Sequence, residues 1–201
     1  MRPSLIQKVL RALAGIAVLA FVWLLLWADY RADQAANPAP AFHAEFELTD
    51  HRGMLRTQED FADQWMLVFF GFTNCPDVCP TTLAEVAAVM DGLGKHADRV
   101  QPHFISVDPE RDTPAALADF VPRFDAGIIG LAGTPEQIER TADNFHIFYE
   151  KPEEAASQGS YAVGHSSQLF LFDPSGGYVK AWQYGTPAEE ILADLQERVA
   201  R

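Results

Sequence analysis

The amino-acid sequence predicts an α/β domain in which a mixed sheet is flanked by helices. Two apolar runs, Met66–Phe70 and His103–Val107, are continuous rather than alternating, which is typical of strands buried on both faces. A helix-like stretch separates them, so they are expected to form a βαβ unit with a parallel strand pair. Later in the chain, Leu169–Phe172 and Tyr178–Trp182 flank a turn at Asp173–Gly177 and predict a hairpin, which adds antiparallel strands.

Local signals place the other elements in order along the chain. A small hairpin is expected around residues 46–55, where a turn sequence separates apolar positions. Apolar residues between positions 83 and 90 recur at helical spacing, and Gly92 and Gly94 are expected to end that helix. A weaker strand is expected at 128–131.

Three Thr-Pro pairs are expected to begin the later helices. They are Thr113-Pro114, Thr134-Pro135 and Thr186-Pro187. Threonine is a good N-cap, and proline suits the first helical position because its missing N–H has no partner there in any case. Gln137 and Glu189 stand three residues after their threonines and would complete capping boxes.

The start of the chain predicts a membrane anchor. Residues 1–8 form a basic segment without acidic residues, and residues 9–28 form an apolar stretch of about the 20 residues needed to span a bilayer. Arg11 lies within this stretch and can extend its charged end to the membrane surface. A cleaved signal peptide is the alternative, but no clean small-residue cleavage site follows the apolar run.

We therefore expect a single-pass protein of a bacterial inner membrane. Basic flanks stay in the cytoplasm, which places residues 1–8 there and the soluble domain in the periplasm. Residues 29–41 are small, polar and proline-containing, as linkers are, and the folded domain is expected at 42–201. The chain carries a net charge of −13, and so acidic a protein is repelled by nucleic acid. Nucleic acid is therefore excluded as a partner.

Cys75 and Cys79, the only cysteines in the sequence, stand between the first apolar strand and a helix expected to begin near Pro80. A cysteine at a helix N-terminus has a lowered thiol pKa, and the thiolate is both a nucleophile and a metal ligand. Residues four apart at a helix start can bring their Cα atoms to about 6 Å, within disulfide range. The pair can be redox-active, metal-binding or both, and two inert buried thiols are the remaining alternative. A dithiol at this sheet edge indicates the thioredoxin class.

Three motifs carry a resemblance to a known family. They are Gly71–Leu83, which contains both cysteines, Ser106–Pro114 and Gly164–Ser167. In this order they resemble the signatures of the Sco/SenC family, copper-binding proteins of cytochrome c oxidase assembly. The resemblance covers about residues 42–201, together with the expected anchor.

The resemblance implies a thioredoxin-like fold with a β-hairpin insertion. It also implies that Cys75, Cys79 and His165 bind one copper ion, as Cu(I) or Cu(II), and that the protein helps to prepare the dinuclear copper site of the oxidase. The implied partners are the copper-bearing subunit of cytochrome c oxidase and other copper chaperones or thiol reductants.

The ligand chemistry agrees with copper but does not single it out. Two thiolates and an imidazole suit copper in either oxidation state, and zinc accepts the same atoms. Of the other histidines, His96 and His103 are expected at the surface or at an edge, and His146 in the core or at an edge. His43 and His51 flank the first hairpin. Asp108 is either part of a strand end and helix cap or a border of the copper site.

Three functions remain open from the residues. The first is a metallochaperone that passes copper on by ligand exchange. The second is a thiol-disulfide reductase that keeps the target cysteines reduced, although three residues rather than two separate this pair and His165 would be superfluous. A peroxidase of the peroxiredoxin kind ranks last, because Phe72 stands where that family has a threonine. The first two can be steps of one mechanism, since a disulfide cannot bind copper. Enzymatic activity is thus left open.

Overall fold

The computed structural model describes residues 15–17, 19–24, 27, 42–150 and 163–200. The chain divides into two units, Met1–Ala39 and Pro40–Arg201. In the first unit the described residues are helical and exposed. In the described residues of both units, no helix is both long enough and apolar enough to span a membrane. The predicted basic segment and linker lie outside the described residues, as does much of the predicted anchor.

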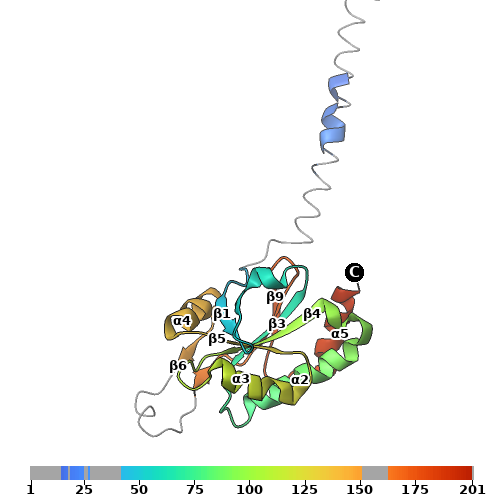
Figure 1. Ribbon diagram of the computed structural model, residues 1–201. Coiled ribbons are helices and arrows are strands. Elements are labelled where there is room, and N and C mark those ends of the chain that lie inside the picture. Colours follow the sequence, from blue (N-terminus) through green and yellow to red (C-terminus); the bar gives the residue numbers. More distant parts are fainter. Residues whose placement is uncertain (1–14, 18, 25–26, 28–41, 151–162, 201) are drawn as a thin grey trace, which may run out of the picture. The chain divides into compact units, whose positions relative to one another are not determined.

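The second unit is built on a mixed sheet. Seven strands of the described part of the chain form it in the order β2-β1-β5-β4-β3-β8-β9 (Figure 1). Their bounds are β1 Glu47–Asp50, β2 Leu55–Thr57, β3 Trp65–Gly71, β4 Val100–Ser106, β5 Ile129–Ala132, β8 Leu169–Phe172 and β9 Tyr178–Trp182. β3, β4 and β5 are parallel, and the other neighbours are antiparallel. The predicted βαβ unit and both hairpins are confirmed, in a thioredoxin-like α/β fold.

Helices cover both faces of this sheet. They are α2 Val78–Leu93, α3 Pro114–Phe120, α4 Pro135–Asn144 and α5 Ala188–Val199, with short 3-10 helices at Gln58–Phe61, Gly94–Arg99 and Val121–Phe124. α2, α3 and α5 lie on one side and α4 on the other (Figure 1).

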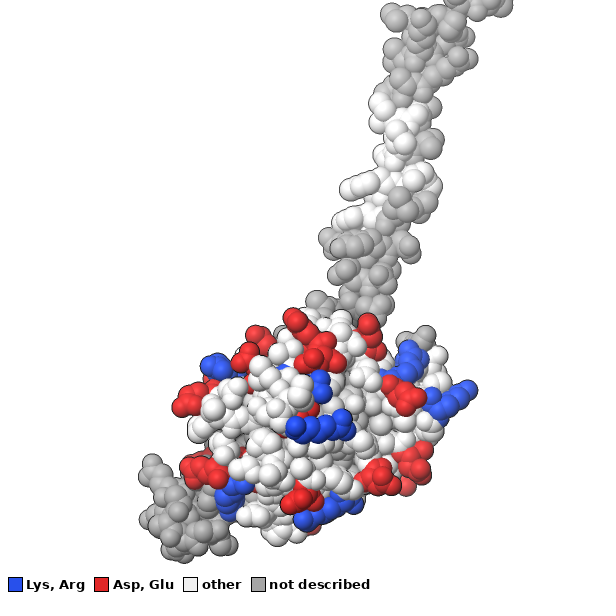
Figure 2. Space-filling view, in the orientation of Figure 1, with Lys and Arg blue, Asp and Glu red and all other residues white. Residues whose placement is uncertain are grey.

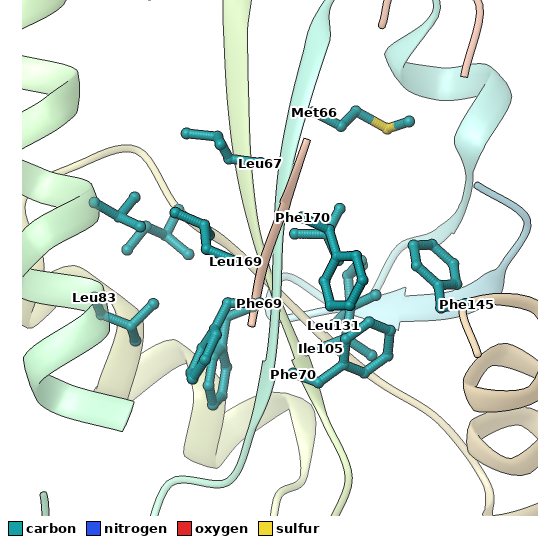
Figure 3. Packing of buried hydrophobic residues seen from close by; sticks show 14 of the residues in the cluster. Met66, Leu67, Phe69, Phe70, Leu83, Ile105, Leu131, Phe145, Leu169 and Phe170 are labelled. Carbon is teal, nitrogen blue, oxygen red and sulfur yellow. The ribbon is translucent and has the colours of Figure 1, made fainter. Parts of the chain in front are cut away.

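The core follows the alternation of β3, which is buried on both faces. Leu67 and Phe69 point toward Leu83 of α2, whereas Met66 and Phe70 point to the opposite side, where Phe145 follows α4 (Figure 3). The continuous apolar run therefore supplies both layers of the core, as its pattern predicts.

Two of the three predicted helix caps are confirmed. The hydroxyl of Thr113 accepts a hydrogen bond from the amide of Ala116, and Thr134 and Gln137 form a capping box. The third prediction is wrong, because α5 begins at Ala188 and the Thr186 hydroxyl instead donates to the carbonyl of Gln183 at 2.8 Å. The Thr186 hydroxyl therefore stabilises the turn before α5 and does not cap the helix.

A separate two-stranded ribbon stands beside the main sheet. Its strands are β6 Tyr149–Glu150 and β7 Gly164–His165, and Tyr149 pairs with His165. The identification of this ribbon with the β-hairpin insertion that the family resemblance implies stays a prediction. The ribbon carries His165, and the segment 151–162 between its strands lies outside the described residues.

The expectation that His103 lies at the surface or at an edge is wrong. β4 begins at Val100, three residues before the predicted start, so His103 lies inside the strand and is 1% exposed. Its ring packs edge-on against Phe61 at 4.4 Å, and neither ring nitrogen has a hydrogen-bond partner of normal geometry in the described part of the chain. Burial lowers the pKa of His103 to about 3, so the folded protein holds a neutral imidazole.

His103→Leu is therefore expected to weaken the dependence of stability on pH. The unfolded chain binds a proton at His103 below about pH 6.5, whereas the folded protein does not until about pH 3. The wild-type free energy of unfolding should then fall by about 2 kcal/mol between pH 6.5 and pH 5 from this group. Urea unfolding of both proteins at these two pH values measures the effect. An equal loss of unfolding free energy in the variant would show that His103 is not the source of the pH dependence.

Candidate metal centre

The two cysteines lie on either side of the start of α2. β3 ends at Gly71, and the loop of residues 72–77, called here the cysteine loop, carries Cys75. α2 begins at Val78, two residues before the predicted start, so Cys79 belongs to its first turn. The amide of Cys79 donates to Cys75 Sγ at 3.3 Å. One of the N–H groups left free at the helix start thus faces the first sulfur.

Gly71 allows α2 to approach the sheet. A Cβ atom at this position would lie 2.8 Å from Cys79 Sγ and 2.8 Å from the ring of Phe104, closer than real contacts allow. The sulfur of Cys79 therefore occupies the space that a side chain would need. Glycine is required here by this close approach rather than by an unusual backbone conformation.

The two thiols differ in access. Cys79 is completely buried, whereas Cys75 is half-buried. Burial raises the pKa of Cys79 far above its ordinary value, and the hydrogen bond to Cys75 acts in the same direction. The lowered pKa that the helix start predicts is therefore wrong for Cys79, because desolvation outweighs the helix dipole. Cys75 is the sulfur that a partner can reach.

His165 comes to the same place from β7. Its Nε2 lies 3.7 Å from Cys79 Sγ, and its Nδ1 lies 3.0 Å from the carbonyl oxygen of Ser166. A carbonyl can only accept, so Nδ1 carries the proton and the lone pair of Nε2 faces the sulfur. Burial lowers the pKa of His165, which keeps the imidazole in the neutral form that binds metals.

Aromatic side chains surround this imidazole. The rings of Phe69 and Phe72 stand edge-on to His165, each at 6.0 Å between centroids. Both belong to the end of β3 or the residue after it, so the strand that positions the cysteine loop also packs against the histidine. The sequence analysis misses this role of Phe72.

The three predicted site residues lie near one another but are not arranged as a complete metal-binding site. In the residues that the structure describes, no three His, Cys, Asp or Glu side chains are close enough together to count as a metal-binding group. Cys79 contacts both other members, through its amide to Cys75 and through its sulfur to His165. Coordination of one ion by all three therefore stays a prediction.

The remaining histidines have other surroundings. His43 and His146 are exposed, so His146 is not in the core, which leaves the edge position of the two that the sequence predicts. His51 Nδ1 accepts from the amide of Gly130 at 3.2 Å, which fastens the first hairpin to β5. His96 is half-buried in the 3-10 helix after α2.

The motif after β4 contributes two buried carboxylates. Asp108 pairs with the guanidinium of Arg111, which lies over the ring of Phe72 at 5.8 Å. Asp108 thus has a structural partner, and Arg111 links it to Phe72, which contacts His165. Asp112 is 1% exposed and binds Thr73 of the cysteine loop. The sequence analysis does not single out Asp112, although this residue lies in the Ser106–Pro114 motif and directly before the Thr113 cap.

Gly71→Ala is expected to disturb the thiol pair. The added methyl group overlaps Cys79 Sγ, and overpacking of this kind costs about 1–3 kcal/mol. Gly133→Ala is a matched control, because its methyl group would meet Leu48 at 2.7 Å instead of a thiol. Both variants should unfold at a lower temperature. Only Gly71→Ala should change the dithiol–disulfide equilibrium in glutathione buffers, and an equal equilibrium constant in the two variants would refute the contact's role.

Alkylation of the reduced protein should distinguish the two thiols. Iodoacetamide at neutral pH is expected to modify Cys75 well before Cys79, because only Cys75 is accessible and Cys79 has a raised pKa. Mass spectrometry of timed samples measures both rates. In urea the two rates should become similar, and similar rates already in the folded protein would contradict the asymmetry.

Comparison with known proteins gives a consistent result. Residues 34–200 match the SCO1/SenC family. The mitochondrial SCO2 homologue of Mus musculus is 34% identical over 206 residues, which cover 98% of this chain and 80% of that protein. The copper-bound structure of ScoI from Bradyrhizobium japonicum is 37% identical and superimposes with a TM-score of 0.71, covering 78% of this chain and 99% of that one.

A third relative bears on thiol chemistry. BsSco, a member of the Sco family of cytochrome c oxidase assembly proteins in which a disulfide switch was identified, is 27% identical, with a TM-score of 0.65 over 80% of this chain and 95% of that one. The family match spans the fold and all three motifs. The chain therefore belongs to the SCO1/SenC family.

Proposed function

We propose that this protein is a copper chaperone that binds one copper ion through Cys75, Cys79 and His165 and helps to assemble the dinuclear copper site of cytochrome c oxidase. The approach of His165 Nε2 to Cys79 Sγ, at 3.7 Å, carries the proposal. The two residues are 86 positions apart, and the fold nevertheless brings a neutral imidazole to a buried thiol. The copper-bound ScoI relative supports the choice of metal.

Copper is the cargo in this proposal. Two sulfurs and one imidazole nitrogen are soft enough to hold Cu(I) and can also accept Cu(II). Three protein ligands leave room for an incoming ligand, so a thiolate of the oxidase subunit can displace them one at a time. Cys75 is the natural site of exchange between sulfurs, because it is half-buried whereas Cys79 is completely buried. Other copper chaperones or thiol reductants would load the metal or keep the pair reduced.

Thiol-disulfide exchange is the second candidate function. The contact between the Cys79 amide and Cys75 Sγ, together with the accessibility of only one sulfur, suits an attacking thiol followed by a resolving thiol. The disulfide switch identified in BsSco supports it. Because a disulfide cannot bind copper, reduction of a partner and delivery of copper can alternate at one site.

The domain layout belongs to the same proposal. Residues 9–28 would anchor the protein in the inner membrane, with residues 1–8 in the cytoplasm, 29–41 as a linker and 42–201 in the periplasm. The apolar sequence and its basic flank support this layout. On the visible face of the domain, acidic and basic side chains are interspersed rather than gathered into one basic patch (Figure 2).

His165→Ala is expected to weaken copper binding by at least about tenfold, since even changes outside the ligand shell have effects of that size. Anaerobic titration of the reduced protein, with the absorption spectrum and metal stoichiometry recorded together, measures it. His43→Ala is the matched control, because His43 is exposed and belongs to another region. Wild-type protein should bind one copper ion when Cys75 and Cys79 are reduced and none when they are oxidised. Equal affinity in the two histidine variants would overturn the ligand assignment.

A protein that starts at Phe42 is expected to fold without the preceding residues. The second unit contains the whole sheet and its helices, so removal of residues 1–41 takes away none of the described core. Circular dichroism and gel filtration in the absence of detergent measure the outcome. A truncated protein that aggregates or lacks a cooperative unfolding transition would contradict this layout.

A further inference from the structure

The cysteine loop is tied to the rest of the domain by a buried carboxylate. Asp112 Oδ2 accepts the amide of Thr73 at 2.9 Å, and Asp112 Oδ1 accepts the Thr73 hydroxyl at 2.5 Å. Thr73 stands two residues before Cys75, and the amide of Cys75 donates to the carbonyl of Phe72 at 3.2 Å. The direction in which the loop leaves β3 is therefore set at Thr73.

Asp112 is itself held in place. The hydroxyl of Ser106 donates to Asp112 Oδ2 at 2.6 Å, and the amide of Asp112 donates to the carbonyl of Asp108 at 2.9 Å. Ser106 is the last residue of β4 and pairs in register with Gly71, the last residue of β3. The carboxylate thus connects the ends of two central strands with the loop that follows one of them.

A carboxylate in this position needs an explanation. Asp112 is 1% exposed, and a buried charge is costly unless hydrogen bonds satisfy it. Two hydroxyls and one amide donate to it here, and charge-assisted bonds of this kind are short and well directed. Hydrogen bonds to such a carboxylate fix the positions of their donors more precisely than apolar packing does. This suits a loop that has to keep a sulfur in one position.

We infer that Asp112 is a positioning residue for the metal centre: it holds Thr73, and through Thr73 it fixes Cys75 relative to Cys79. The inference rests on the proposed function of the thiol pair. Asp112 touches neither copper nor a partner in this arrangement. Besides burial, its charge also raises the pKa of Cys79, so Thr73→Val, which leaves that charge in place, is the variant that isolates the positioning role. A purely fold-stabilising role is the rival explanation.

Asp50 supplies a control for the rival explanation. It is 2% exposed and accepts the amides of Arg52 and Met54 and the guanidinium of Arg56, in the hairpin between β1 and β2. Asp50→Asn and Asp112→Asn therefore both remove the charge of a buried, fully bonded carboxylate. Only the second variant should affect the thiols.

Variants of Thr73 test the connection from the loop side. Thr73→Val removes the hydroxyl that donates to Asp112 and keeps the shape of the side chain, whereas Thr73→Ser keeps the hydroxyl. Thr73 is only half-buried, so these changes are expected to leave the domain folded even where Asp112→Asn does not. Thr73→Ser serves as the conservative rescue.

The experiment measures three quantities in each full-length variant: the dithiol–disulfide equilibrium constant of Cys75 and Cys79 in glutathione buffers, the copper affinity with its absorption spectrum, and the unfolding temperature. Asp112→Asn and Thr73→Val are expected to change the equilibrium constant and to weaken copper binding by about tenfold or more. Thr73→Ser and Asp50→Asn should keep wild-type values for both. The double variant of Asp112 and Thr73 should be no worse than Asp112→Asn alone, because the two act through one contact.

The outcomes separate the inference from the proposed function. If Asp112→Asn and Thr73→Val lower only the unfolding temperature, as Asp50→Asn does, the positioning role is wrong while copper binding by the wild type stands. If the wild type binds no copper, the proposed function fails, and the equilibrium constant of the thiol pair still decides whether Asp112 positions the loop. Additive effects in the double variant would also overturn the inference.

Discussion

The close packing of the first turn of α2 against the end of β3 is the constraint on which the rest of the site depends. Cys79 Sγ fills the space that a side chain at Gly71 would need, and Phe69 of the same strand packs against the ring of His165. β3 can offer this surface because it lies inside the sheet, between β4 and β8. The strand therefore supports Cys79 from α2 and His165 from β7, and Cys75 lies in the loop that follows it.

This arrangement gives the two sulfurs different tasks. Cys79 is buried, so under the proposed function it would hold the ion where water and partners cannot reach it, and its raised pKa means that metal binding has to displace its proton. Cys75 is accessible and receives the amide of Cys79, so it is suited to exchange. Chaperone and reductase then use the same asymmetry. His165 contacts Cys79 directly, so its imidazole also lies within reach of the thiol chemistry that a reductase would use.

The sequence predicts the sheet well because its signals are local. The apolar run of β3, the Thr134 cap and the turn between β8 and β9 each act over a few residues. The burial of His103 could not be predicted, because it depends on where β4 starts and on aromatic rings from other segments.

The same distinction between local signals and distant contacts applies to the site. The cysteine pair is visible in the sequence because both residues follow one strand end. Its buried member departs from the expected pKa mainly because burial under α2 desolvates the thiol. His165 is selected among six histidines only by the family resemblance, since its contact with Cys79 spans 86 residues. The most direct test of the account is X-ray absorption spectroscopy at the copper edge of the loaded wild type and of His165→Ala. The account predicts two sulfur neighbours in both proteins and imidazole scattering in the wild type that the variant loses. A copper shell without sulfur, or imidazole scattering that persists in the variant, would contradict it.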